Sequence, residues 1–360
     1  MNKNVQLRYP CLDGIKAIAC LLVFAYHYWL VFGHVFWGLD FFGDKLNFVY
    51  YGRYWVQLFY LISAFLIGKS LYAKCDTTQI CNVVIKRYFR LTLPVLGVCI
   101  LIFGMSKLGM FQNERIVESI LDKEEFKLLY QDGFSITEVI IKPLTMLFCD
   151  NDINKFNFSF WMLRPLFWGN MIAMGIVIFT DANRKKDFFA FAVALLIGLC
   201  CAREYLAFFL GTLLARIHCD TKLHYKKSIW QGVLCGLFII VGVTLVEMGW
   251  QRDDINAVSV FCLMAGVLGV SWICRCLSLK PLVAVGKVSY YVFLIHCPVI
   301  YSLSYYLFIE MNGMASYTTV VRIIFLVTLL VILLVAWLMA KYLDRLFGQI
   351  TNKILYLFNK

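Results

Sequence analysis

The sequence predicts an all-α protein that crosses a membrane about ten times as a polytopic bundle of helices. Hydrophobic residues make up 61% of the 360 residues and charged residues only 16%, whereas apolar residues are roughly 45–50% of a typical soluble domain. The apolar residues also form long runs instead of short alternating blocks, which indicates lipid around most of the chain. A soluble globular fold could not cover that much apolar surface.

Ten apolar runs are candidate transmembrane helices, since a helix of about 20 residues crosses the hydrocarbon core. The first run resembles a signal peptide because basic residues precede it. It is too long for one and further spans follow, so we expect an uncleaved helix. The fifth and sixth runs are short, and a single re-entrant hairpin fits them as an alternative to two spans. The runs are 12–32, 55–73, 91–106, 160–180, 188–201, 203–217, 229–249, 256–274, 283–308 and 320–342.

Lysine and arginine residues concentrate in alternate loops, and this bias indicates the loops that face the cytoplasm. Both termini are therefore expected in the cytoplasm, which requires an even number of spans. The longest loop on the opposite side, 107–159, is rich in acidic residues. Its spacing predicts a short amphipathic helix from Ile116 to Leu129, followed by a turn at Asp132–Gly133.

Composition argues against several classes of protein and site. The net charge of +12 does not indicate nucleic-acid binding, because the basic residues lie between apolar runs, where they orient the chain in the membrane. The 14 cysteines are scattered without a Cys-x-x-Cys pair, so we interpret them as small apolar residues and expect neither a metal site nor a disulfide framework. We expect one domain over 1–360, multi-pass in the cell (plasma or inner) membrane, with 107–159 as its long extracytoplasmic loop.

Ionisable residues inside the apolar runs are candidates for function, because lipid makes them costly. In the first run Lys16 and His27 are eleven residues apart, so on a helix they share a face and lie about 16 Å apart along the axis. His27 falls in the outer half of the span. It fits a general base, and it equally fits a core histidine bonded to a neighbouring carbonyl or hydroxyl group.

The next two runs carry polar residues with two interpretations each. Gln57 and Ser63 follow Arg53 in the second run, although Ser63 also suits close packing of helices. The third run begins with a basic cluster that includes Arg87 and Arg90. Such a cluster at a helix start suits phosphate groups, and it suits anchoring to lipid headgroups equally well.

Two later runs add aromatic and basic groups. The fourth begins with Trp161 and Arg164, just inside a membrane edge. The ninth contains Ser289, Tyr290 and His296, with Pro298 two residues after the histidine. A proline inside a helix leaves a carbonyl group unpaired and should kink the helix. We therefore expect a polar pocket around His296.

Together these segments resemble the acyltransferase-3 family of bacterial integral-membrane O-acyltransferases that act on surface polysaccharides. In that family the first helix starts Leu-Asp-Gly-Leu-Arg-Ala, with a catalytic histidine eleven residues after the arginine. The second helix carries Phe-Phe-x-x-Ser-Gly-Phe-Leu-Ile, the third Arg-x-x-Arg-x-x-x-Pro, and a late one Leu-Gly-Lys-Ile-Ser-Tyr and Leu-Leu-His-x-Pro. The matching segments are Leu12–Ala17 with His27, Val56–Ile67, Arg87–Pro94 and Val285–Pro298.

The chain departs from the family pattern at four of these positions. Lys16 replaces the arginine and therefore keeps the charge without the bidentate fork. Gln57 stands where many relatives have an acid, and Ala64 replaces the glycine. Leu166 occupies the place of a glutamate that many relatives carry five residues after the tryptophan. These departures bear on how the acceptor is handled.

The resemblance implies an acyltransferase for groups other than aminoacyl groups. It would move an acyl group, with acetyl as our first expectation, from cytoplasmic acyl-CoA to a hydroxyl group of a cell-surface polysaccharide or its lipid-linked precursor. Acyl-CoA would be a co-substrate and no cofactor would stay bound, while membrane lipids would surround the protein. The site residues implied are His27 as the base; Lys16, Arg87 and Arg90 for CoA phosphates; Arg53, Trp161, Arg164 and Arg203 at the outward mouth; and Ser63, Ser289, Tyr290 and His296 around the cavity.

Two other classes of function fit the same sequence pattern. An exporter of polysaccharide or lipid-linked sugars would also be polytopic, although the two halves show no repeat of the kind common in transporters. A catalytically inactive membrane sensor is the third reading, because Lys16 and Leu166 depart from the family pattern. Surface glycans with and without the protein would separate the three classes by loss of an O-acyl group, of the whole polymer, or of neither.

Overall fold

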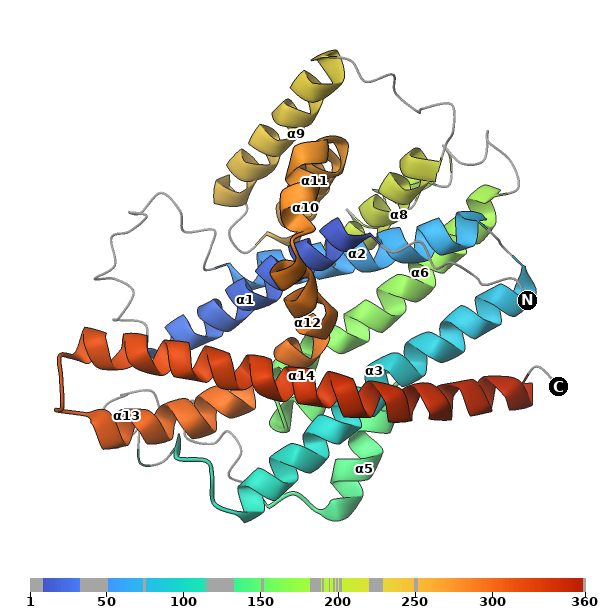
Figure 1. Ribbon diagram of the computed structural model, residues 1–360. Coiled ribbons are helices and arrows are strands. Elements are labelled where there is room, and N and C mark those ends of the chain that lie inside the picture. Colours follow the sequence, from blue (N-terminus) through green and yellow to red (C-terminus); the bar gives the residue numbers. More distant parts are fainter. Residues whose placement is uncertain are drawn as a thin grey trace.

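All regular elements that the structure describes are helices, which confirms the prediction of an all-α protein (Figure 1). The computed structural model describes residues 9–32, 51–73, 76–113, 115, 133–149, 152–181, 189, 191–193, 195, 196, 198, 200, 203–219, 229–248 and 252–358. The helices are α1 (Pro10–Phe32), α2 (Gly52–Ala73), α3 (Thr77–Lys107), α5 (Ile136–Thr145), α6 (Leu163–Asp181), α8 (Leu206–Cys219), α9 (Ile229–Met248), α10 (Asp253–Gly269), α11 (Ser271–Leu277), α12 (Lys280–Val299), α13 (Tyr305–Met311) and α14 (Tyr317–Phe358). Short 3₁₀ segments are η4 (Ile153–Lys155), η5 (Phe158–Met162) and η6 (Arg203–Tyr205), and η8 (Ile300–Ser304) is a π-helix.

The protein has several helices that can cross a membrane. Within the described residues, 6 stretches are long and apolar enough, or up to 7 if the pair α10 and α11, bent by 101°, forms one span. These stretches match predicted spans one to four, eight, nine and ten. The seventh predicted span, 229–249, corresponds to the 20 residues of α9. The sixth corresponds to the 14 residues of α8, and the fifth, 188–201, is described only in part, at 189, 191–193, 195, 196, 198 and 200. Ten spans and cytoplasmic termini stay predictions.

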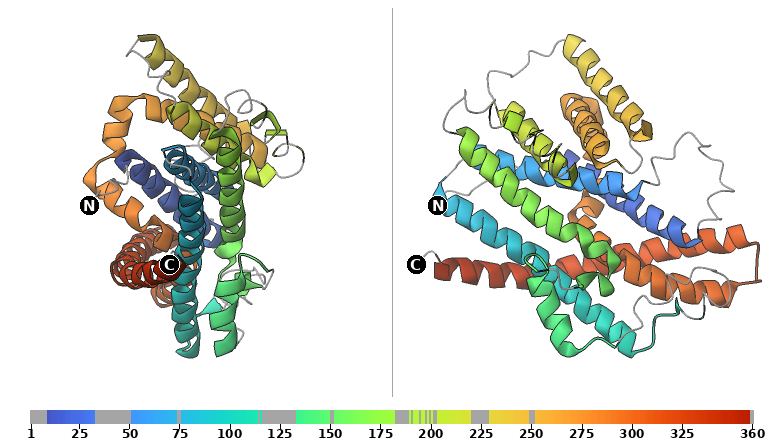
Figure 2. Two further views of the ribbon diagram at one scale, coloured as in Figure 1. Left: turned by 90° about the vertical axis from the view of Figure 1, so that its right-hand side faces the viewer. Right: turned by 180° about the vertical axis from the view of Figure 1, so that it is seen from behind.

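The bundle has two ends that can be named from their contacts. At the Tyr9 end, the Tyr9 ring lies 6.1 Å from that of Phe65 and 6.2 Å from that of His218, so the start of α1 meets the ends of α2 and α8. At the Arg53 end, the guanidinium group of Arg53 on α2 pairs with the carboxylate of Asp253 at the start of α10. Helices α1 and α2 run between these ends in opposite directions (Figures 1 and 2).

Glycines let α1 approach its neighbours closely. A Cβ atom on Gly286 of α12 would clash with the backbone carbonyl of Asp13, and one on Gly14 would clash with that of Leu277 at the end of α11. Because both obstacles are backbone atoms, they cannot move aside as a flexible side chain would. These two contacts fix α1 against α11 and α12 and so set the position of every residue farther along α1.

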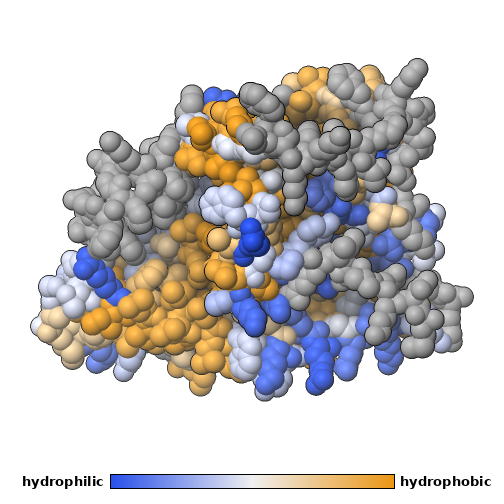
Figure 3. Space-filling model, turned by 45° about the horizontal axis from the view of Figure 1, so that its top comes forward, coloured by the Kyte–Doolittle hydropathy of each residue, from blue (hydrophilic) through white to orange (hydrophobic). Residues whose placement is uncertain are grey.

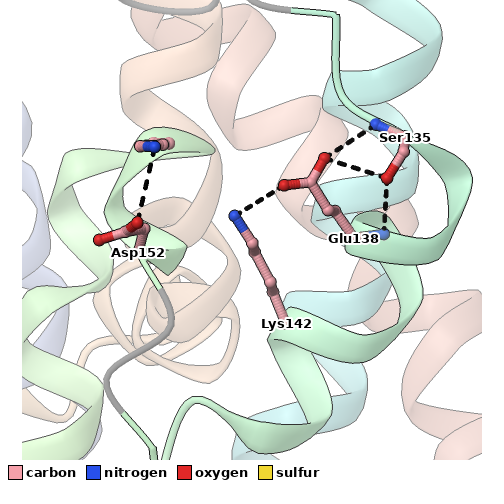
Figure 4. Close-up of polar contacts among 5 residues, drawn as sticks. Ser135, Glu138, Lys142 and Asp152 are labelled. Atoms are coloured by element: carbon pink, nitrogen blue, oxygen red, sulfur yellow. Dashed lines mark hydrogen bonds and ion pairs between the residues drawn. The ribbon is translucent and has the colours of Figure 1, made fainter.

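The 107–159 region contains a helix that we did not predict. Helix α5 begins with a capping box, in which Ser135 and Glu138 bond each other's backbone (Figure 4). Glu138 also pairs with Lys142 at 2.9 Å, and the ammonium group together with the Ser135 donors holds the pKa of this carboxyl at about 2. The signal was present in the sequence, as Ser-x-x-Glu before an apolar run. The predicted helix at Ile116–Leu129 lies outside the described residues.

The outer surface of the bundle is apolar over long stretches. Large hydrophobic side chains of α14, such as Leu326, Leu330 and Leu334, are more than half exposed. Helix α9 lies at one edge of the bundle and packs on α10, where Gly242 meets backbone atoms of Ser259 and Leu263 (Figure 1). Figure 3 shows hydrophobic side chains over much of the described part of one face, with hydrophilic ones gathered along part of its margin. Such a surface suits lipid rather than water.

Substitution of Gly286 tests whether the stability of the protein depends on the close approach of α1 and α12. We expect Gly286→Ala to lower the free energy of unfolding by about 1–3 kcal/mol, because the new methyl group meets the Asp13 carbonyl. Gly104→Ala on α3 is the matched control, since no atom lies within 4 Å of its new Cβ and alanine favours a helix by up to about 1 kcal/mol. Unfolding in detergent micelles measures both. Equal stability of the two variants would contradict the close approach of α1 and α12.

Candidate active site

Two histidines from opposite ends of the sequence meet between α1 and α12. Nε2 of His296 lies 3.1 Å from Nδ1 of His27, and the two ring centroids are 4.8 Å apart. His296 is fully buried, while His27 retains partial exposure. Both residues were candidates from the sequence, His27 as a base and His296 as support for a cavity. Their direct contact was not predicted.

Backbone carbonyl groups determine which nitrogen of each ring carries the proton. Nδ1 of His296 lies 2.6 Å from the carbonyl oxygen of Phe293, and Nδ1 of His27 lies 2.9 Å from that of Val23. A carbonyl oxygen can only accept, so each Nδ1 is the donor. Nε2 of His296 is then an acceptor, and the Nδ1 proton of His27 is shared between Val23 and His296. The basic lone pair of His27 is left on Nε2.

Pro298 changes the backbone next to His296, and the kink that the sequence predicted there stays a prediction. A proline has no N–H to donate, so the carbonyl of Leu294, four residues earlier, loses its helical partner. The side-chain amide of Asn157 donates to that carbonyl at 2.8 Å. One turn later the chain forms the π-helix η8, in which Ser302 Oγ donates to the Pro298 carbonyl at 2.7 Å. The irregularity therefore appears as a π-helix, a form common at functional sites.

Asn157 also ties η5 to the site. Its side-chain oxygen accepts bonds from the backbone N–H and the hydroxyl group of Ser159, at 3.0 and 2.7 Å. Phe158, between them, places its ring 5.1 Å from that of His27, and Tyr26 flanks the same histidine at 5.1 Å. The imidazole of His27 is thus held by contacts with two aromatic rings and by the hydrogen bond that its Nδ1 donates to Val23. This arrangement restricts the directions in which Nε2 can point.

Cys297 adds a thiol group to the two histidines. Its Sγ lies 3.1 Å from Nε2 of His296, and His27, His296 and Cys297 together offer three ligand atoms within 4.8 Å. This set resembles the nitrogen and sulfur ligands that zinc takes. Binding through Nδ1 of His27 would require a metal to displace the proton shared with Val23. The expected absence of a metal stays a prediction.

The residues implied for CoA phosphates lie on two helices towards the Tyr9 end. Nε of Arg87 on α3 is buried without a hydrogen-bond partner among the described residues. Tyr290 of α12 donates to the carbonyl of Leu91 at 3.0 Å, which joins α12 to the helix that carries Arg87 and the exposed Arg90. Lys16 instead pairs with Asp13 at 2.7 Å on its own helix.

The remaining cavity candidates, Ser63 and Ser289, make internal contacts. Ser289 Oγ donates to the carbonyl of Gly286 at 2.9 Å, within α12. Ser63 Oγ donates to the side-chain oxygen of Asn170 at 3.0 Å and thereby joins α2 to α6. Both contacts stabilise the helices that surround the site.

Residues implied for the outward mouth gather at the Arg53 end. The guanidinium carbon of Arg53 lies 5.7 Å from the centre of the Trp161 ring, within the range of a cation–π contact. The same side chain donates to Asp253 at 3.1 Å. Arg164 and Arg203 are exposed, on α6 and η6. The structure therefore brings Arg53 and Trp161 together at one site.

Sequence reasoning missed Asn157, Asp253 and Cys297. Pro298 indicated that the carbonyl group four residues earlier needs another donor. No sequence pattern identified that donor as an asparagine 137 positions away along the chain. Asp253 falls between two predicted spans, in a segment expected to be a loop. Cys297 is one of 14 cysteines, and nothing in the sequence distinguished it from the others. A search for polar residues between apolar runs would have found the first two without assigning them partners.

The chain is similar to a known protein family. The model of a family described as an acyltransferase domain matches residues 9–341, which is most of the chain and includes both histidines. No curated protein and no solved structure matches.

Loss of the Asn157 side chain should weaken the fold around His296. We expect Asn157→Ala to lower the free energy of unfolding by about 1–3 kcal/mol, because the Leu294 carbonyl and two Ser159 donors lose their partner. Gln112→Ala is the control, since that amide makes exposed contacts only, and it should change stability by less than about 0.5 kcal/mol. Denaturant unfolding in micelles compares the two. A neutral Asn157→Ala would contradict the assigned network.

Proposed function

We propose a function from the premise that the chain belongs to the acyltransferase-3 family, whose model covers residues 9–341. Membership makes the protein a multi-pass membrane acyltransferase. Our proposal for this chain is transfer of an acyl group, acetyl first, from cytoplasmic acyl-CoA to a hydroxyl group of a cell-surface polysaccharide or its lipid-linked precursor. The pairing of His27 with His296 carries the proposal.

In this proposal His27 is the general base. Its Nδ1 proton is engaged by Val23 and His296, so Nε2 has the lone pair that can accept a proton from a hydroxyl group. Among the described residues, every hydrogen bond of the His27 ring is made by Nδ1. Nε2 is therefore available to a substrate in the partly exposed position that His27 occupies.

The reaction forms one ester bond and breaks one thioester bond. Nε2 of His27 takes the proton of the acceptor hydroxyl group, and the oxygen attacks the thioester carbonyl carbon of acyl-CoA. Collapse of the tetrahedral intermediate expels the CoA thiolate, which receives the proton from His27. The products are an O-acylated acceptor and free CoA, and no redox step or metal is needed to balance the reaction.

His296 acts through His27 as a positioning residue. Its Nε2 accepts the Nδ1 proton of His27, and this bond becomes charge-assisted when His27 takes up the substrate proton. The bond from Nδ1 of His296 to Phe293 holds that ring in the accepting tautomer. The arrangement corresponds to a base and its orienting partner, with a neutral imidazole as the partner.

Arg87 supports binding of the CoA end of the donor. A guanidinium nitrogen that is buried without a partner is costly, and a phosphate group would provide the missing acceptor. Lys16 and His27 are separated by about 16 Å along α1. In the proposal the CoA phosphates therefore bind towards the Tyr9 end, while the thioester reaches His27 deeper in the bundle.

Removal of the His27 imidazole tests the proposed base. We expect His27→Ala to lower transfer of radiolabelled acetyl from acetyl-CoA in membranes by at least about a hundredfold, the low end of general-base effects. His218→Ala is the control, because that ring packs on Tyr9 and Phe65 at the Tyr9 end. Transfer is normalised to the amount of protein in each membrane. Undiminished transfer by His27→Ala would exclude the assignment.

Two variants of His296 separate positioning from folding. His296→Leu should lower kcat and leave KM for acetyl-CoA unchanged, while His296→Gln, whose amide oxygen can still accept the Nδ1 proton, should recover part of kcat. A rise in KM in both variants, with kcat unchanged, would speak against positioning.

Substitution of Arg87 tests binding of the donor. Arg87→Gln should raise KM for acetyl-CoA about tenfold, as expected for loss of one charge-assisted hydrogen bond, with little change in kcat. Arg275→Gln, an exposed position on α11, should leave KM unchanged. The kinetics are measured with purified protein in micelles. An unchanged KM in Arg87→Gln would remove this residue from the donor site.

A further inference from the structure

Two buried amides lie at the contact between α2 and α10, and the side-chain oxygen of each is without a hydrogen-bond partner among the described residues. Gln57 is 3% exposed and Asn256 2%. Gln57 Oε1 and Asn256 Oδ1 are both buried without a hydrogen-bond partner among the described residues, and so is Oδ1 of Asp253. Buried polar groups are usually paired, because an unpaired one costs free energy that water would otherwise offset. Three unpaired oxygens therefore point to a bound group.

The register of α10 directs Asn256 towards α2. Asp253 and Ser259 both touch α2, through the Arg53 pair and through a contact of 3.3 Å between Ser259 Oγ and the Tyr54 hydroxyl group. At about 100° per residue, Asn256 lies midway between these two, both along the helix and around it. A residue midway between two contacts with α2 must also face α2.

The register of α2 directs Gln57 towards α10. Arg53 and Tyr54 make the two contacts with α10. Gln57 lies at about 40° around the helix from Arg53 and about 60° from Tyr54, between the two, and one turn deeper in the bundle. Gln57 and Asn256 thus lie on facing surfaces, one turn below the Arg53–Asp253 pair. We call Gln57, Asp253 and Asn256 the amide pocket.

The chemistry of the amide pocket favours hydroxyl groups over a cation. Its three unpaired atoms are acceptors, and a hydroxyl group can satisfy such an oxygen by donating its proton. The Asp253 charge is already paired with Arg53 at 3.1 Å, which weakens its attraction for a second cation. Trp161, 37% exposed, borders Arg53 and supplies an aromatic face of the kind that packs against sugar rings.

We propose that Gln57, Asp253 and Asn256 bind hydroxyl groups of the glycan acceptor, next to Arg53 and Trp161. The proposal rests on the proposed function for the identity of the acceptor, and it adds residues of α10 that the sequence did not indicate. It makes the amide pocket a determinant of acceptor affinity, with no contact to acyl-CoA. Apolar substitutions there should therefore affect only one of the two substrates.

Binding without turnover tests the amide pocket directly. The probe is a panel of methyl glycosides of gluco, galacto and manno configuration, added to purified protein in micelles, with the melting temperature as readout. We expect at least one glycoside to raise the melting temperature of the wild type but not of Gln57→Leu or Asn256→Leu. Val258→Leu is the matched control, because it adds the same side chain on an exposed face of α10 and should respond as the wild type does.

The variants also separate a binding role from a structural one. If the amides serve binding, replacing an unpaired polar group by leucine should leave the melting temperature without ligand unchanged or raised. A fall well below that of Val258→Leu would show that the amides hold the fold and would overturn the proposal. Stabilisation by sodium or calcium chloride but by no glycoside would identify a cation site and also overturn it. The absence of stabilisation by any glycoside or by either salt would also overturn the proposal.

Kinetics with the glycoside that binds best complete the test. Asn256→Leu should raise KM for that glycoside about tenfold, as expected for loss of one or two hydrogen bonds, with KM for acetyl-CoA unchanged. Equal KM values for the glycoside in Asn256→Leu and Val258→Leu would overturn the proposal. If the wild type transfers no acetyl group, the proposed function fails, whereas the melting temperatures still decide whether the amide pocket binds sugars.

Discussion

The hydrogen bond between His27 and His296 is the contact on which the candidate site depends. It forms only because α1 and α12 approach closely, and the approach is possible because Gly14 and Gly286 place no side chain against opposing carbonyl groups. Residues separated by 269 positions are thereby held with ring nitrogens 3.1 Å apart. In a bundle whose outside is apolar, such a polar contact has to be assembled from several helices at once.

Backbone carbonyl groups around this bond fix the orientation and the tautomer of the two imidazole rings. Val23 and Phe293 each accept a ring proton, which fixes both tautomers. Pro298 frees a carbonyl that Asn157 then binds, and this contact anchors η5 and the Phe158 ring beside His27. A proline that would only weaken a soluble helix therefore organises a polar site here, because every freed backbone group in lipid must find a partner.

Single helices were readable from the sequence, whereas contacts between them were not. Lys16 and His27 lie on one helix, as their spacing predicted. Pro298 predicted a kink beside His296, and the structure has a π-helix one turn after the histidine. Lys16 pairs with Asp13 three residues earlier on the same helix, a spacing that the sequence already contains. The spacing could not reveal that the two histidines meet, because that contact depends on how α1 and α12 pack. The short helix α8 and the bend between α10 and α11 also prevent a single count of spans, since length and composition do not distinguish a broken span from a re-entrant one.

The central claim is that His27 holds its proton on Nδ1 and presents a basic Nε2. Nitrogen-15 NMR of histidine-labelled protein in lipid measures this directly, with a His27→Gln variant to identify the signal among the five histidines. At neutral pH we expect a protonated Nδ1 and an unprotonated Nε2 for His27. A proton on Nε2, with Nδ1 unprotonated, would contradict the account, because the lone pair would then face His296 instead of the substrate.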